Sequence, residues 1–168
     1  MDSVNNISII VAIGKDYEIG LKNQLLWHIS DDLKHFKQIT SGKLVIMGEN
    51  TWLSLPKRPL PKRRNLVLTL NKNAHFEGAE TVHSINSALQ AIASEEEIFI
   101  IGGAMVYKQF MPLASKLYIT HVMENFEADT WFPKIEPAEW SLVNKSEIFI
   151  NPDSQIHYYF AEYHRKNK

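Results

Sequence analysis

Residues 98–111 read IFIIGGAMVYKQFM, a stretch that joins two kinds of regular structure. Its first four residues form a short apolar run, as expected for a strand that is buried on both faces. Gly102 and Gly103 follow, and residues 104–111 are a candidate helix. A strand, a tight glycine turn and a helix in succession predict one unit of an α/β fold.

The same alternation continues along the chain in both directions. Strand-like runs occur at residues 7–13, 44–47, 65–70, 98–101, 117–122, 142–150 and 156–163. Candidate helices lie between them at residues 31–40, 49–54, 84–94 and 104–111, with Ser84 as the expected N-cap of the third. The last two strands are separated only by a turn-rich link at residues 151–154, so we expect an antiparallel hairpin there and a mixed sheet overall.

Composition excludes several classes of protein. A chain of 168 residues is close to one ordinary domain, so we expect a single domain spanning residues 1–168. The net charge of −1 supplies no field that would draw the chain onto nucleic acid or a membrane. Without cysteine there is no disulfide, thiolate nucleophile or cysteine-ligated metal, and no HExxH motif is present, so we expect no metal. The apolar runs are too short to span a bilayer, which predicts a cytoplasmic protein.

The helix at residues 31–40 carries one acid on its apolar side. Asp32 shares that side with Phe36 and Ile39. A carboxylate placed there loses water, which raises its pKa and suits it to act as a general acid. The alternative is that Ser30, Asp31 or Asp32 simply caps the helix, and the helix alone favours that interpretation.

Two further segments suggest ligand binding. Residues 14–27 form a long loop bounded by glycines, a length typical of lids and binding elements. Residues 57–64 hold five basic residues in eight positions. A solvated loop is the ordinary explanation, and the absence of interleaved aromatics argues against nucleic acid, so a small-anion site is preferred. Gly102 and Gly103 open a helix where backbone N–H groups receive a phosphate, or else make a tight turn with no ligand.

A set of short motifs, taken together and in order, resembles the dihydrofolate reductase family. They are Ile19-Gly20, Asn23, Leu26-Trp27-His28, Asp31-Asp32-Leu33 with Phe36-Lys37, residues 45–48 with Thr51-Trp52 and Ser54, residues 58–61 with Arg63 and Asn65, residues 101–103 with Val106-Tyr107, residues 117–121, and Asp129-Thr130 with Phe132-Pro133. The resemblance runs from about residue 7 to residue 133. It implies a single-domain α/β fold with a central, mostly parallel eight-stranded mixed sheet, about four flanking helices and a C-terminal antiparallel hairpin.

The resemblance also implies an activity and a set of site residues. The family moves hydride from NADPH to C6 of 7,8-dihydrofolate and adds a proton at N5, giving the tetrahydrofolate used in one-carbon and thymidylate metabolism. By resemblance, Asp32 assists protonation, Trp27 holds a water, and Thr120 bonds the carboxylate. The implied substrate residues are Ile10, Ala12, Leu33, Phe36, Leu55 and Ile101, with Arg63 for the carboxylate of the glutamate tail. The implied cofactor residues are Ala12, Ile19, Gly20, Gly48, Asn50, Thr51, Thr69, Leu70, Ile101, Gly102, Gly103, Ala104, Met105, Val106, Tyr107 and Thr130. Dihydrofolate, NADPH and antifolate inhibitors are the expected partners of a monomer that binds neither nucleic acid nor membrane.

Some residues depart from the family pattern. Leu26 and Ser30 stand where prolines are common, which predicts a more mobile loop. Glu49 stands where many members carry arginine, so the strength of the preference for NADPH over NADH stays open: Glu49 points away from the cofactor, or Lys72 compensates its charge. Two rival interpretations remain, a pyrimidine reductase of riboflavin synthesis with the same fold, and a non-catalytic pterin or nucleotide binder.

Overall fold

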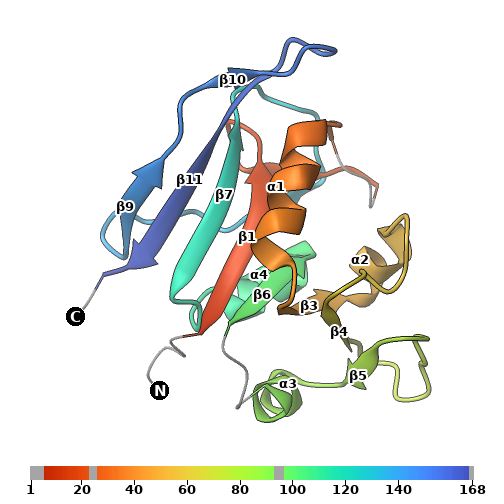
Figure 1. Cartoon of the computed structure of the whole chain (residues 1–168). Helices are drawn as coiled ribbons and strands as arrows, with labels where there is room; N and C mark the ends of the chain where they lie inside the picture. Colours follow the sequence, from red (N-terminus) through yellow and green to blue (C-terminus); the bar gives the residue numbers. More distant parts are fainter. Residues whose placement is uncertain (1–5, 23–25, 93–96, 167–168) are drawn as a thin grey trace.

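The structure is a computed structural model that describes residues 6–22, 26–92 and 97–166. Figure 1 shows strands and helices alternating along most of the chain. The strands are β1 (Ile7–Ile13), β2 (Glu18–Gly20), β3 (Leu44–Gly48), β4 (Arg64–Leu68), β5 (Glu80–Val82), β6 (Ile98–Gly102), β7 (Lys116–Val122), β8 (Thr130–Trp131), β9 (Trp140–Lys145), β10 (Phe149–Ile150) and β11 (His157–Arg165). The helices are α1 (Ser30–Thr40), α2 (Glu49–Ser54), α3 (Ile85–Ala91) and α4 (Ala104–Phe110).

One large mixed sheet organises the molecule. Its strand order is β10-β11-β7-β1-β6-β3-β4-β5, and β9 also pairs with β11. The pairs from β7 through β1, β6, β3 and β4 to β5 are parallel, whereas β11 is antiparallel to β7, β9 and β10. The predicted α/β class, the mostly parallel sheet and the C-terminal hairpin are therefore confirmed.

The hairpin differs from the prediction in one respect. A single strand over residues 142–150 was expected, but the chain forms β9 and β10 with a break between them. The reason lies at Ser146, whose hydroxyl accepts the N–H of Phe160 at 2.9 Å and so takes the place of a backbone partner. Since β9 and β10 both lie along β11, they occupy one position, and the described sheet has the eight positions expected.

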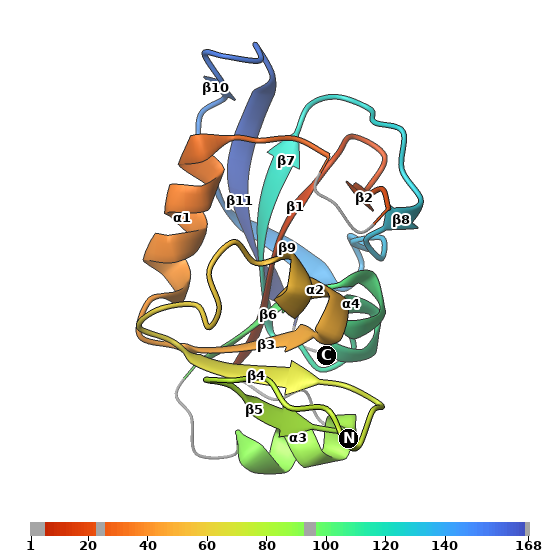
Figure 2. The ribbon, with the colours of Figure 1, turned by 90° about the vertical axis from the view of Figure 1, so that its right-hand side faces the viewer.

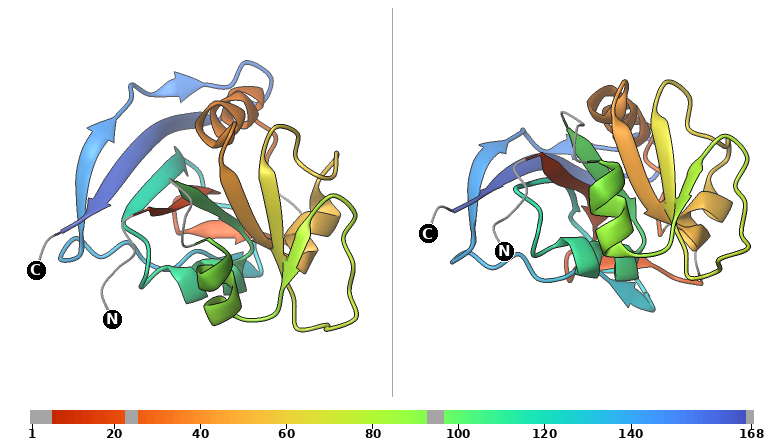
Figure 3. Two further views of the ribbon diagram at one scale, coloured as in Figure 1. Left: turned by 60° about the horizontal axis from the view of Figure 1, so that its bottom comes forward. Right: turned by 90° about the horizontal axis from the view of Figure 1, so that it is seen from below.

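Apolar side chains fill both faces of the sheet. On one face, Ile9, Ile46 and Ile100 pack with Val106 and Phe110 of α4. On the other, the cluster of Val45, Met47, Val67 and Phe99 packs with Trp52 of α2 and with side chains of α1. Figure 3 shows α1 on one side of the sheet and α3 and α4 on the other. The alternation along each strand thus sends successive residues into two separate cores.

The ends of the helices agree only in part with the predictions. Ser84 caps α3 as expected, since its side chain accepts the N–H of Ser87 at 3.0 Å. The predicted extension of this helix to residue 94 falls partly outside the described residues, and α3 ends at Ala91. For α1, the alternative of a side-chain cap at Ser30, Asp31 or Asp32 does not hold, since the N-cap is Ile29 and no side chain caps the helix. Among the described residues, no helix is long and apolar enough to cross a membrane.

Candidate active site

Asp32 lies in the first turn of α1 and faces the sheet. Thr120 of β7 donates its hydroxyl to Oδ1 of Asp32 at 2.6 Å. Burial raises the pKa of Asp32, and the hydrogen bond from Thr120 only partly opposes this, so the pKa lies above that of a free aspartate. Because the helix has no side-chain cap, Asp32 is free to take this position instead of binding backbone N–H groups.

The strand β11 holds the start of α1 in place. The buried Tyr158 donates its hydroxyl to Asp31 at 3.0 Å. One turn further, the ring of His35 stacks on Phe160 with centroids 3.9 Å apart. Burial lowers the pKa of His35 and so favours the neutral form of its ring. The pair of Asp31 and Tyr158 was not predicted, because its members lie far apart in the sequence.

Apolar side chains gather around the carboxyl end of β1 near Asp32. Four predicted substrate residues pack in one cluster, Ile10, Phe36, Leu55 and Ile101. Ala12 is paired with Thr120 across β1 and β7. The side chain of Leu33 is half exposed, whereas Trp27 belongs to a different cluster and packs on Phe126 with ring centroids 4.9 Å apart. The structure thus brings four of the six predicted substrate residues into one cluster.

Arg63 lies beside this cluster, and two of its guanidinium nitrogens donate hydrogen bonds within the protein. Its Nε donates to the carbonyl of Pro61 at 2.9 Å, and Nη1 donates to the hydroxyl of Thr40 at 3.0 Å. Its guanidinium carbon lies 5.8 Å from the centre of the Phe36 ring. The neighbouring Arg64 instead forms an ion pair with Glu80. Within the described chain, Nη2 of Arg63 has no hydrogen bond partner, so the guanidinium still has N–H groups for an anion.

Two glycine turns meet at the carboxyl ends of β3 and β6. The peptide bond between Gly102 and Gly103 is cis. A Cβ added to Gly102 would lie 3.1 Å from Oγ1 of Thr51, and one added to Gly48 would lie 3.1 Å from Val106. The position of Gly102, with φ of +131°, also disfavours any residue with a side chain. Both glycines therefore pack closely on neighbouring residues, Gly102 on Thr51 and Gly48 on Val106, which holds the ends of β3 and β6 and the starts of α2 and α4 close together.

The remaining predicted cofactor residues extend from these turns. Ala104, Met105, Val106 and Tyr107 belong to the first turns of α4, and Asn50 lies next to Thr51 in α2. Tyr107 is buried, and its hydroxyl donates to the carbonyl of Ile10 at 3.0 Å, which ties α4 to the strand beneath Asp32. At the end of β4, Thr69 is buried and Leu70 is 91% exposed.

The loop after β1 is joined to the chain between β7 and β8. Ile19 and Gly20 lie in β2, which pairs with Thr130 in β8, and Figure 2 shows both short strands beside the end of β1. Glu18 is 3% exposed and accepts the N–H groups of Asp16 and Phe126. Burial acts to raise the pKa of Glu18, but its hydrogen bonds outweigh this and lower it. The sequence signal for this role, a single acid between Tyr17 and Ile19, was missed.

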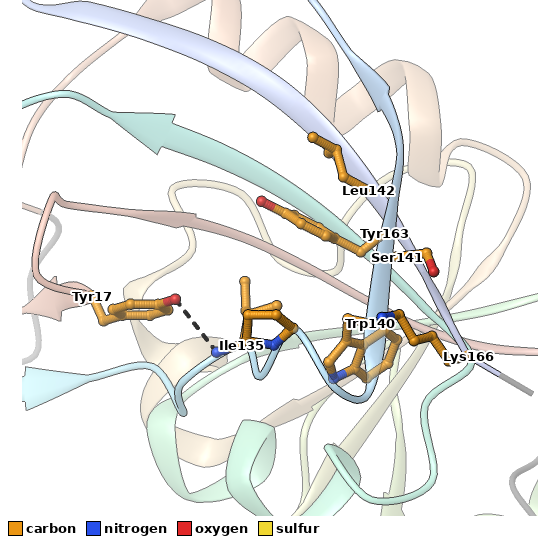
Figure 4. Close-up of a pocket in the computed structure, with 8 residues that line it drawn as sticks. Tyr17, Ile135, Trp140, Ser141, Leu142, Tyr163 and Lys166 are labelled. Atoms are coloured by element: carbon orange, nitrogen blue, oxygen red, sulfur yellow. Dashed lines mark hydrogen bonds between the residues drawn. The ribbon is translucent and has the colours of Figure 1, made fainter. Parts of the chain in front are cut away.

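Two cavities lie away from Asp32. The larger, of about 510 Å³, is shown in Figure 4, and its wall includes Tyr17, whose hydroxyl accepts the N–H of Ile135 at 3.4 Å. It is lined by Tyr17, Ile135, Pro137, Trp140, Ser141, Leu142, Tyr163 and Lys166, none of which was predicted to be a site residue. The smaller, of about 260 Å³, includes Ala104 and Met105 in its wall. Within the described residues, no group of three or more His, Asp or Glu is placed to hold a metal ion.

Comparison with known proteins identifies the family. A sequence profile named Dihydrofolate reductase matches residues 6–165. A dihydrofolate reductase of Neisseria gonorrhoeae is 43% identical over 157 residues, covering 94% of this chain and 96% of that protein. The chain belongs to the dihydrofolate reductase family. A dihydrofolate reductase of Bacillus subtilis (strain 168) is 38% identical over 161 residues, covering 96% of this chain and 95% of that protein.

The fold agrees with this family. The solved structure of a dihydrofolate reductase from Enterococcus faecalis, complexed with NADP(H) and RAB-propyl, has a TM-score of 0.88 and 31% sequence identity, and the match covers 99% of this chain and 100% of that one. The chain is thus an NADPH-dependent oxidoreductase that reduces dihydrofolate. Two features of the site have to be assigned roles in this reaction. They are the hydrogen-bonded pair of Asp32 and Thr120, and the glycine turns that end β3 and β6.

Proposed function

We propose that Asp32 binds the pterin ring of dihydrofolate and assists its protonation at N5. The observation that carries this proposal is the partly buried Asp32 carboxyl, which accepts the Thr120 hydroxyl at 2.6 Å through Oδ1. Its Oδ2 has no hydrogen bond partner within the described part of the chain, so it is available to a ligand. A carboxyl with a raised pKa retains a proton closer to neutral pH, which is the state that a general acid needs.

The other residues have supporting roles in this proposal. The cluster of Ile10, Phe36, Leu55 and Ile101, with Ala12 and Leu33 beside it, holds the flat ring and excludes water. Thr120 orients the carboxyl, and Trp27 holds the water that relays the proton. Arg63 binds the carboxylate of the glutamate tail, because a planar guanidinium presents paired donors to two oxygens.

The glycine turns fit the cofactor. A side chain at Gly48 or Gly102 would crowd Val106 or Thr51, so the turns that end β3 and β6 lie close together at one edge of the sheet, where the backbone N–H groups at the starts of α2 and α4 can receive a phosphate. We assign these turns to the pyrophosphate of NADPH, with Asn50, Thr69, Leu70 and residues 104–107 along its length. Ile19, Gly20 and Thr130 approach it from the small sheet of β2 and β8. When bound, NADPH supplies the hydride.

We also propose that residues 1–168 act as one domain, as a monomer and in the cytoplasm. The single large sheet that runs through the chain from β1 to β11 supports the first of these. The bacterial relatives named above support the placement of this enzyme in general folate metabolism.

The test of the assigned roles is a direct assay. The purified protein is mixed with dihydrofolate and NADPH, and loss of the absorbance of reduced nicotinamide is followed over pH. We expect turnover that is faster on mild acidification, because N5 needs a proton, and a severe loss in Asp32→Asn. Wild-type turnover in Asp32→Asn would refute the role of the acid. Its matched control is Asp153→Asn, the same change in an exposed turn.

A further inference from the structure

The strand order determines which end of the cofactor lies at which strand. This step rests on the proposed function, which puts the nicotinamide beside the pterin at Asp32, near the ends of β1 and β6. The parallel strands β1, β6, β3 and β4 are neighbours in that order, so their carboxyl ends follow one another along one edge. The glycine turns that end β6 and β3 take the middle of the dinucleotide. Its adenosine half therefore lies at the end of β4, where Thr69 and Leu70 follow.

A carboxylate is held at that place. Glu49 is the first residue of α2, and its Oε1 accepts the hydroxyl of Thr69 at 3.2 Å. The buried Thr69 is itself fixed, since its hydroxyl accepts the N–H of Asn71 at 3.1 Å and its carbonyl lies 3.0 Å from Nδ1 of His83. Glu49 thus points toward the end of β4. Its second carboxylate oxygen has no hydrogen bond among the described residues.

No lysine or arginine side chain is held beside Glu49 and Thr69 by a hydrogen bond or ion pair among the described residues. Leu70, which follows Thr69, is 91% exposed and offers no cation to a phosphate. Lys72 and His75 follow β4 in an exposed turn, where neither makes a hydrogen bond or ion pair with another described residue. The charge that the structure fixes beside Thr69 is therefore negative.

The sign of that charge bears on the choice of cofactor. A carboxylate beside the adenosine ribose accepts a hydrogen bond from a free 2′-hydroxyl, the arrangement typical of NAD-binding sites, whereas a nearby arginine accommodates the 2′-phosphate. The same carboxylate repels the phosphate that distinguishes NADPH from NADH. We propose that Glu49 sets the cofactor specificity of this enzyme and allows it to use NADH alongside NADPH. This adds a second hydride donor to the NADPH of the family.

The test compares the two cofactors at saturating dihydrofolate. We expect the wild-type kcat/KM values for NADPH and NADH to lie within about tenfold of each other. Glu49→Gln raises the ratio in favour of NADPH, and Glu49→Arg raises it by about 100-fold or more, chiefly through the KM for NADPH. Titration with NADP⁺ and NAD⁺, followed by tryptophan fluorescence, gives the same order without relying on turnover. The matched control is Glu77→Gln, an exposed acid beyond the same turn, which leaves the ratio unchanged.

Other results would overturn the proposal. A wild-type preference for NADPH above about 1,000-fold that Glu49→Gln does not alter would show that the carboxylate faces away from the ribose. A collapse of NADPH affinity in Lys72→Ala, with Glu49→Gln unchanged, would assign specificity to the lysine instead. Absence of turnover with either cofactor would overturn the proposed function, and the NADP⁺ and NAD⁺ titrations would still decide the role of Glu49.

Discussion

The hydrogen bond between Thr120 and Asp32 gives the sharpest test of the site. Valine at position 120 keeps the branched shape and removes only the hydroxyl, so the buried position, 3% exposed, is not emptied. The bond favours the ionised carboxylate, whereas burial favours the neutral acid, and burial remains in the variant. Loss of the bond must therefore raise the pKa of Asp32 further.

The size of the shift follows from the worth of such a bond. A hydrogen bond to a charged group contributes about 1.5–3 kcal/mol. Since one pKa unit corresponds to about 1.4 kcal/mol, Thr120→Val should raise the pKa of Asp32 by about 1–2 units. The limb of the kcat/KM profile on which the acid loses its proton then moves to higher pH by the same amount.

The assay is a pH profile of kcat/KM for dihydrofolate at saturating NADPH, from about pH 5 to about pH 9. Thr120→Ser is the matched control, because it keeps the hydroxyl and should leave the profile close to that of the wild type. A Thr120→Val profile that coincides with the wild type would refute the argument. An equal shift in the serine variant would show that packing, and not the hydrogen bond, sets the pKa.

Three further changes test other parts of the site. Because the pKa of Asp32 is raised, its contribution to stability is present at low pH and is lost as the pH rises through that pKa. Above neutral pH, Asp32→Asn should therefore unfold at a higher temperature than the wild type while losing activity by about 100-fold or more. A lower melting temperature in that pH range would contradict this. Because the pKa of Glu18 is lowered, Glu18→Gln should lower the free energy of unfolding, measured with urea at neutral pH, by about 1–3 kcal/mol. The difference between variant and wild type should fade as the pH drops below about 4. An equal difference at both pH values would count against the role of the Glu18 charge. Arg63→Lys should raise the KM for dihydrofolate by about tenfold or more and leave the KM for a dihydropterin without a glutamate tail unchanged. Lys62→Ala is the control. An equal effect on both substrates would show that Arg63 acts on packing.

The elements predicted correctly are those whose pattern is local. Residues 7–13 and 49–54 form a strand and a helix with the predicted bounds. The apolar run at residues 7–13 specifies its strand without help from distant residues. The strands β2, β5 and β8 were missed. Each has only two or three residues, and their partners define them more than their own composition does. The break at Ser146 has the same cause, since a partner in β11 decides it.

In the candidate site, too, local features were predicted and contacts between distant parts of the sequence were not. The apolar side of α1 and the lone acid on it are visible in the helical period of residues 31–40. Thr120 bonds Asp32 across 88 positions in sequence, and Tyr158 bonds Asp31 across 127, so only the family resemblance indicated the first and nothing indicated the second. The contact of Glu49 with Thr69 places the carboxylate at the end of β4, which the sequence alone did not indicate.

The hold of β11 on α1 has a consequence for how the enzyme is made. Asp31 and His35 are fixed by Tyr158 and Phe160, which a ribosome adds long after α1, β1 and β7 have been synthesised. Domains fold as units, with their earlier parts emerging first. A nascent chain that already contains Asp32, both glycine turns and Arg63 therefore lacks these contacts of β11 with α1. We expect reductase activity to begin only once β11 has been synthesised.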